Sequence, residues 1–192
     1  MAIRSKAYKS LQVDAFRKCA SETPLALLNL SSIWERSISK NEKLLMSTRK
    51  NDPITIFHGL KAPNLSVTQY MERIFKYTRC SASCFVIAQI YMDRFFQKMG
   101  GCLTSFNAHR LLITSVMVAA KFVDDMHCSN AYYAKVGGVS TEEMNEMEIE
   151  FLFNLEFKLF VTEEVFLKCC EKLDRAVVGE YQFRGPIRGH AK

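Results

Sequence analysis

The apolar residues of this chain recur with the 3.6-residue period of α-helices almost throughout, and the alternation typical of β-strands is rare. The stretch LLITSVMVAAKF, from Leu111 to Phe122, is apolar or small until Lys121. Its residues would cover the whole circumference of a helix, so other helices must enclose it. A charge at the end of such a helix is costly unless it reaches water or a partner. We therefore predict a buried central helix whose Lys121 lies where the core meets the surface.

Two other helices are predicted to begin at a capping box, in which a serine and the side chain three residues later satisfy each other's backbone N–H groups. Ser66 and Gln69 have this spacing, and Ser140 and Glu143 repeat it. Each pair is followed by an amphipathic stripe of apolar residues. Both helices are therefore expected to bury one face in a common core.

Stripe spacing, a proline in a first turn and Gly-Gly stop signals predict four more helices. They cover about residues 24–40, residues 84–99, a short segment over 130–136, and residues 162–177. Residues 39–53 are expected to form the tail of the first of these helices and then a loop. The five helices between residues 66 and 155, with the third apolar all round, imply an all-α domain in which four helices surround a central one.

The positive charge of the chain lies at its two ends. Residues 1–22 carry five basic and two acidic side chains, residues 175–192 carry four basic and one acidic, and together they account for the net charge of +6. The middle of the chain is therefore neutral. Basicity confined to the ends is typical of tails, and it argues against a DNA-reading face and against nucleic acid as the partner.

Seven cysteines without a C-x-x-C pair indicate free thiols in an intracellular, reducing compartment, the nucleus or the cytoplasm. His127 and Cys128, which follow Asp124 and Asp125, could suggest a thiol nucleophile or metal ligands. Adjacent residues on a turn rarely face one another, and no second ligand pair accompanies them. We therefore expect no catalytic site, no metal and no cofactor. Lys121 and the aspartate pair also interrupt the longest apolar run, so no membrane span is expected.

Three strings, in the right order and spacing, resemble the cyclin box. They are IYMDRFF at residues 90–96, VMVAAKFVDD at 116–125 and MEIEFLFNLEFKLFVT at 147–162. More narrowly, FHGLKAPNLSVTQYMERIFKYTRCS and YYAKVGGVS are similar to the P-type, or U-type, cyclins of plants, relatives of the yeast phosphate-pathway cyclin. The resemblance implies a five-helix cyclin box over residues 54–164, an N-terminal extension with one helix and a linker over 1–53, and a C-terminal helix with a basic tail over 165–192.

The resemblance also implies a regulatory subunit that binds and activates a cyclin-dependent kinase, not an enzyme with a small-molecule substrate. In the family, a lysine that ends the third helix and a glutamate on the fifth grip the kinase beside its mobile αC helix, and these roles fall on Lys121 and Glu148. A local salt bridge between the two residues is the alternative role for them. The apolar wall of the same interface would comprise Val118, Phe122, Leu152, Phe157 and Leu159.

Two further expectations follow from the resemblance. A buried ion pair is implied between Arg73 and Asp93, where it would specify geometry more than add stability. The MRAIL-like string of substrate-recruiting cyclins is replaced by MERIF, so docking through that apolar patch is not expected. The alternative function is a cyclin-fold adaptor in a transcription or nucleic-acid complex without kinase activation. The Lys121 and Glu148 pair and the neutral middle of the chain favour the kinase partner.

Overall fold

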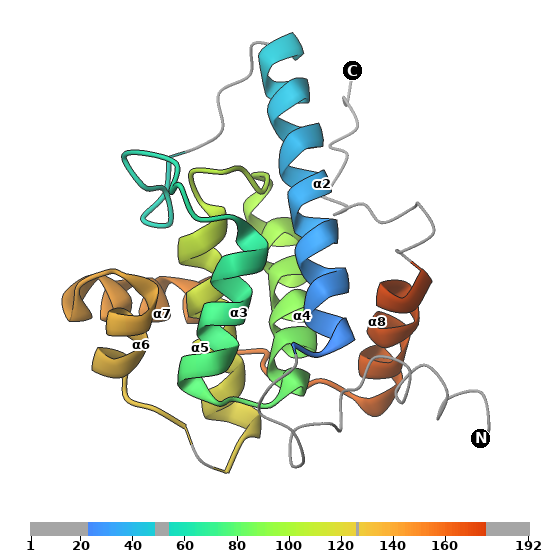
Figure 1. Ribbon diagram of the computed structural model, residues 1–192, viewed down its shortest axis with the longest axis vertical. Helices are drawn as coiled ribbons and strands as arrows, with labels where there is room; N and C mark the ends of the chain where they lie inside the picture. The colour runs from blue at the N-terminus through green and yellow to red at the C-terminus, as the bar shows by residue number, and fades with distance from the viewer. Residues whose placement is uncertain (1–22, 49–53, 126, 176–192) are drawn as a thin grey trace.

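The computed structural model describes residues 23–48, 54–125 and 127–175. These residues form seven helices and no strand, which confirms the all-α prediction (Figure 1). In chain order the helices are α2 (Leu25–Thr48), α3 (Val67–Thr78), α4 (Ala82–Met99), α5 (Ala108–Val123), α6 (Asn130–Gly137), α7 (Thr141–Asn154) and α8 (Glu163–Arg175). None of these helices is long and apolar enough to cross a membrane.

Helix α5 is the buried centre of the bundle. Every residue from Leu111 to Ala120 is buried, including the polar Thr114 and Ser115. Both hydroxyls donate to carbonyls one turn earlier in the same helix, at 2.8 and 3.0 Å, so burial leaves neither group without a hydrogen bond. Helix α5 contacts α3, α4, α6 and α7. Other helices therefore enclose this apolar segment, as the sequence predicts.

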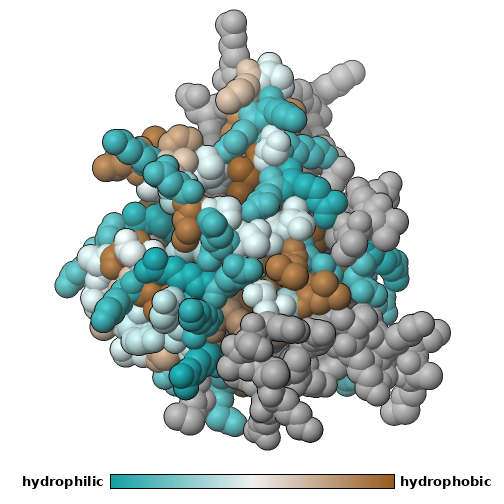
Figure 2. Space-filling model, viewed as in Figure 1, coloured by the Kyte–Doolittle hydropathy of each residue, from teal (hydrophilic) through white to brown (hydrophobic). Residues whose placement is uncertain are grey.

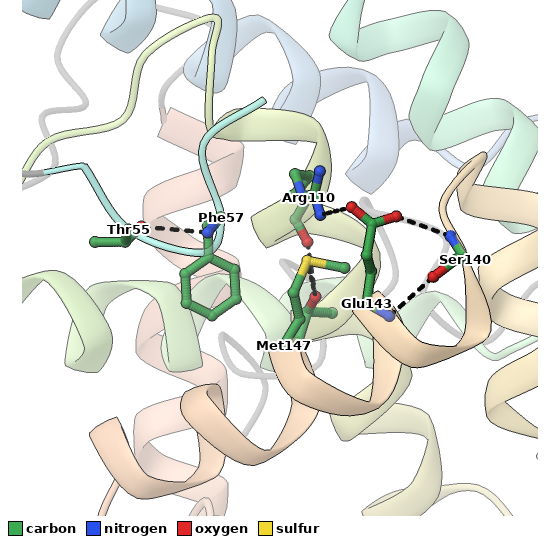
Figure 3. A network of polar contacts seen from close by, with 7 residues as sticks. Thr55, Phe57, Arg110, Ser140, Glu143 and Met147 are labelled. Atoms are coloured by element: carbon green, nitrogen blue, oxygen red, sulfur yellow. Dashed lines mark hydrogen bonds and ion pairs between the residues drawn. The ribbon is translucent and has the colours of Figure 1, made fainter. Parts of the chain in front are cut away.

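Both predicted capping boxes are present. The Ser66 hydroxyl accepts from the Gln69 backbone N–H at 3.1 Å, and the Gln69 side chain accepts from the Ser66 N–H at 3.2 Å. Ser140 and Glu143 form the same pair of bonds at 3.1 and 3.0 Å. Figure 3 shows the Glu143 carboxylate between the Ser140 backbone and the guanidinium of Arg110 on α5. The start of α7 is thereby fixed to the central helix.

Helix α2 differs from the prediction because it continues to Thr48, beyond the expected end near residue 40. The polar residues that suggested a linker are mostly good helix formers, and some of them bind the loop before α5. Asn41 donates to the Leu103 carbonyl at 2.9 Å, and Glu42 accepts from a backbone N–H of the same loop at 2.9 Å. These contacts give the polar end of the helix a structural role that periodicity alone does not reveal.

Helix α8 packs against α2 and α4, on the opposite side of the bundle from α6 and α7 (Figure 1). Cys169, Cys170 and Leu173 form its buried face, and Asn29 of α2 donates to the Leu173 carbonyl at 3.3 Å. The six described cysteines are free thiols. On the face seen in Figure 2, the described residues are mostly hydrophilic or intermediate and the hydrophobic patches are small. Most of the apolar residues of the described helices are therefore used inside the bundle.

Candidate functional site

Lys121 and Glu148 lie side by side, at the end of α5 and on the side of α7 that faces α5 and α6. The Nζ atom of Lys121 donates to Oε1 of Glu148 at 2.6 Å. Their side chains are 29% and 17% exposed, so the pair is half-buried and still reachable from outside. A lysine in the last turn of a helix also complements the negative end of the helix dipole. The local salt bridge that the sequence left as an alternative is present, and it leaves two N–H donors of the ammonium group for other acceptors.

The second oxygen of Glu148 is also occupied. The Nδ2 atom of Asn130 lies 2.7 Å from Oε2 of Glu148 and 2.7 Å from Oδ1 of Asn145. Asn130 is the first residue of α6, directly after the capping residue Ser129. Because each carboxylate oxygen of Glu148 has its own donor, the orientation of the carboxylate is fixed. Lys121, Asn130, Asn145 and Glu148 are called the polar cluster below.

The apolar residues predicted beside this pair occupy three kinds of position. Phe122 and Phe157 are 49% and 58% exposed. Leu152 and Leu159 are partly buried and pack against the core. Val118 is only 2% exposed in the enclosed helix α5, so it can contribute little accessible surface, and its place in the apolar wall stays a prediction. The accessible part of the predicted wall is therefore formed by the end of α5, the outer face of α7 and the segment after α7.

The segment after α7 has an unusual backbone that is held by α4. Glu156 and Phe157 have φ values of 53° and 56°, in the left-handed region that residues other than glycine rarely adopt. The Tyr91 hydroxyl donates to the Leu159 carbonyl at 2.7 Å, and the Arg94 guanidinium donates to two further carbonyls of the segment at 2.6 and 3.2 Å. These bonds from α4 keep the strained turn in place and so set the direction of Phe157.

The sequence comparison gives the family. A cyclin family model matches residues 16–159, more than half of the chain. The chain belongs to the cyclin family. This cyclin is 52% identical over 165 residues to Cyclin-P3-1 of rice (Oryza sativa subsp. japonica), covering 86% of the chain and 70% of that protein.

Relatives in a second plant carry U-type names. This cyclin is 52% identical over 138 residues to Cyclin-U4-1 of Arabidopsis thaliana, covering 71% of the chain and 68% of that protein. It is 44% identical over 188 residues to Cyclin-U3-1 of the same plant, covering 97% of the chain and 84% of that protein. The resemblance to plant P-type and U-type cyclins is therefore confirmed. Cyclins are regulatory proteins, so this chain is not itself an enzyme.

The predicted ion pair between Arg73 and Asp93 is not formed. The Nε atom of Arg73 donates to the Val136 carbonyl at 2.9 Å, where α3 contacts α6. Asp93 accepts from the Gln89 amide at 3.0 Å within α4. Helix α3 packs on α2, α5 and α6, and the bond of Arg73 goes to α6. Arg73 thus ties two helices of this cyclin together through a backbone carbonyl.

Within the DDMHC string, Asp124 has a structural role. The Asp124 carboxylate accepts from the backbone N–H and hydroxyl of Ser81 at 2.9 and 2.8 Å, and from the Cys84 thiol at 3.2 Å. It therefore joins the end of α5 to the start of α4. Burial raises the pKa of the Cys128 thiol, which keeps the thiol protonated and a poor nucleophile near neutral pH. Among the described residues, no group of three or more His, Cys, Asp and Glu side chains could hold a metal ion.

The sequence missed two members of the polar cluster. Asn145 lies one turn before Glu148 on the same face of α7, so the helical period could have indicated it. Asn130 belongs to α6, and only the packing of α6 against α7 brings it to the carboxylate. No local pattern around Asn130 gives this contact. The outer face of α7 was also missed, because the predicted stripe described only its inner side.

Proposed function

We propose that this cyclin binds and activates a cyclin-dependent protein kinase by positioning the αC helix of the kinase. The observation that supports the proposal best is the half-buried pair of Lys121 and Glu148, oriented by Asn130 and followed in the sequence by exposed Phe122. Charged groups that are already oriented, beside exposed aromatic side chains, are typical of the anchor of a protein interface. The similarity to cyclins also supports a regulatory role for this chain.

The polar cluster can bind a kinase through its backbone. The two N–H donors of Lys121 that Glu148 does not take can donate to carbonyls at the end of a partner helix. Oxygens of the Glu148 carboxylate have further lone pairs that can accept from partner N–H groups. Burial of Phe122, Phe157 and Leu152 against the partner would remove water from these bonds and strengthen them. The cluster would thus orient the kinase, while the apolar residues would supply most of the free energy of binding.

Activation follows from differential binding to two states of the kinase. A protein kinase needs its lysine–glutamate ion pair and a positioned αC helix before phosphoryl transfer is efficient. A cyclin that binds only the state with this helix in place shifts the kinase toward that state, by as much as its affinities for the two states differ. All residues that perform chemistry then belong to the kinase. The cyclin contributes contacts alone.

The test is co-expression of the full chain with a panel of cyclin-dependent kinases, read by co-purification and by phosphorylation of a peptide substrate. Lys121→Ala and Glu148→Ala are expected to lower affinity at least about tenfold, because each removes one charge of the half-buried pair. Lys168→Ala is a matched control, since Lys168 forms an exposed pair with Glu164 at 2.7 Å on α8. Circular dichroism and thermal melting of each variant check that the fold is kept.

Three outcomes distinguish the possibilities. Loss of kinase binding in both site variants, with Lys168→Ala unchanged, supports the proposal. Normal binding by both Lys121→Ala and Glu148→Ala would show that the proposed interface is wrong. A complex that forms without any gain in phosphorylation would favour the alternative function of a cyclin-fold adaptor that binds partners without activating a kinase.

A further inference from the structure

Helix α7 has two apolar faces, and its own bundle covers only one of them. Met144, Met147 and Phe151 are completely buried on the inner side. Ile149 and Phe153, four residues apart on the outer side, are 56% and 63% exposed. A helix at the surface of a bundle normally presents polar residues outward. Two large apolar side chains in register on the outward face indicate a surface that a partner covers.

The outer apolar residues continue into the turn after α7. The rings of Phe153 and Phe157 meet edge to face, with centroids 5.4 Å apart and an angle of 76° between their planes. The left-handed backbone of Phe157, held from α4, fixes one member of this pair. Ile149, Phe153 and Phe157 are called the apolar edge below. Because its rings already contact each other, the edge loses little side-chain freedom when a partner binds.

The apolar edge and the polar cluster lie next to each other on α7. Ile149 follows Glu148 in the sequence, and the partly buried Leu152 lies one turn after Glu148 and directly before Phe153. One surface therefore runs from the Lys121 and Glu148 pair, across Leu152, to Phe153. A partner that binds Lys121 and Glu148 and covers Leu152 would therefore also contact the apolar edge. Because the two parts of the surface are continuous, we expect the kinase that binds the Lys121 and Glu148 pair to cover the apolar edge as well.

The charges around the apolar edge have opposite signs at its two ends. Exposed Glu146 and Glu150 flank Ile149 beside an open depression of about 510 Å³. At the other end, Lys98 and Lys158 both bind Glu156, and they lower the pKa of its carboxyl to about 2. Two lysines against one carboxylate leave that end positive. A partner surface that is complementary to the edge is therefore apolar in its centre. It carries basic groups opposite Glu146 and Glu150, and acidic groups opposite Lys98 and Lys158.

The opposite charges at the two ends of the edge favour a folded protein as the partner over a lipid surface or a nucleic acid. Lipid headgroups and nucleic acids present negative charge throughout, so Glu146 and Glu150 would repel them. A folded protein can carry both signs on either side of an apolar patch. We propose that Ile149 and Phe153 extend the kinase-docking surface beyond the polar cluster and select among kinases by this apolar, oppositely charged match. The inference rests on the proposed function, because the same kinase must occupy both parts of the surface.

The experiment measures the affinity of full-length variants for each kinase that co-purifies with the wild-type chain. Phe153→Ala and Ile149→Ala are expected to weaken binding of the preferred kinase about tenfold, and binding of the weaker partners by less. Leu44→Ala is the matched control: Leu44 is an apolar residue of α2 that is 57% exposed. It should change affinity by less than about twofold. All three side chains are exposed, so the melting temperatures should stay close to that of the wild type.

A charge variant tests the polarity separately. Glu150→Lys is expected to slow association with the preferred kinase, and the loss should shrink as salt concentration rises, because salt screens exposed charges. Glu142→Lys, an exposed glutamate in the first turn of the same helix, serves as the control for added charge. Equal effects from Glu150→Lys and Glu142→Lys would contradict the proposed polarity.

The outcomes separate failure of this inference from failure of the proposed function. If Lys121→Ala abolishes kinase binding while Phe153→Ala and Ile149→Ala bind normally, the kinase docks without the apolar edge and the inference is wrong. If the wild-type chain binds no kinase, the proposed function fails and the inference fails with it. If light scattering shows a wild-type dimer that Phe153→Ala converts to a monomer, a second copy covers the edge and the kinase assignment is overturned.

Discussion

The Nδ2 atom of Asn130 lies 2.7 Å from Oε2 of Glu148, which brings the first residue of α6 to the carboxylate of α7. Lys121 occupies the other oxygen at 2.6 Å. Glu148 is therefore held from two neighbouring helices, and its carboxylate cannot turn away without losing a hydrogen bond. The carboxylate is thus oriented before any partner binds, so binding costs less side-chain entropy.

Asn130→Ala is expected to weaken kinase binding by about 1 kcal/mol, roughly fivefold, because a hydrogen bond to a charged group is lost and Glu148 gains freedom. The loss should be smaller than that of Glu148→Ala, which removes the carboxylate itself. Isothermal titration with the co-purifying kinase measures both. Asn64→Ala is a suitable control, since Asn64 is an exposed asparagine in the loop before α3. Unchanged affinity in Asn130→Ala would show that Lys121 alone orients the carboxylate.

Local signals were enough to predict most of the fold. The capping boxes at Ser66 and Ser140 and the all-round apolar character of the segment before Lys121 each depend on residues within a few turns of one another. Such features can be seen in a single sequence because backbone geometry sets their spacing. The length of α2 was underestimated for a related reason. Its polar end binds a loop about sixty residues later, and no local spacing shows that contact.

The site was only partly predictable. Lys121 and Glu148 came from the family resemblance, and the structure brings them together, whereas Asn130 depends on how α6 packs against α7. The same limit applies to Val118, whose burial depends on the neighbours around α5. Arg73 was paired with the wrong element, because the family pattern gave residue types without the direction in which α3 faces. Contacts between helices are set by packing, which a pattern along one chain does not contain.

Gly137→Ala tests the packing of α6 that positions Asn130. A Cβ atom at Gly137 would lie 3.1 Å from Cγ1 of Ile113 and 3.2 Å from the hydroxyl of Tyr70, and that hydroxyl already donates to the Gly137 carbonyl at 3.0 Å. The crowding should lower the free energy of unfolding by about 1–3 kcal/mol. Urea denaturation measures the change. In a Tyr70→Phe background the extra loss should be smaller, because one of the crowded atoms is gone.

A Gly137→Ala protein as stable as the wild type would show that α6 can move away from Ile113 at little cost. Kinase affinity provides a second readout. If α6 shifts, Asn130 moves with it, so a variant that keeps its stability but loses affinity would place the effect in the polar cluster.

The Glu143 carboxyl should make stability depend on pH. The backbone N–H of Ser140 and then the guanidinium of Arg110 hold the pKa of this carboxyl below its ordinary value of 4.5. A lowered pKa in the folded state adds stability above the unfolded value, and this contribution is lost as pH falls through the folded value. Glu143→Gln can still form the capping box but cannot ionise. The stability difference between wild type and variant should therefore shrink when urea denaturation is moved from about pH 6 to about pH 3. A difference that does not change with pH would contradict this assignment.

Arg94 is expected to act on partner binding through the segment after α7. Its guanidinium donates to the carbonyls of Lys158 and Phe160 at 2.6 and 3.2 Å, on either side of Leu159 and next to the strained Phe157. Arg94→Lys keeps the charge but cannot span two carbonyls with one planar group, so it should behave like Arg94→Ala. Both variants should increase amide hydrogen exchange over residues 156–160 and weaken kinase binding several-fold, with little change in melting temperature because the group is exposed. Unchanged exchange in both would mean that the Tyr91 bond to Leu159 is sufficient to hold the segment. Faster exchange with unchanged affinity would instead remove Phe157 from the docking surface.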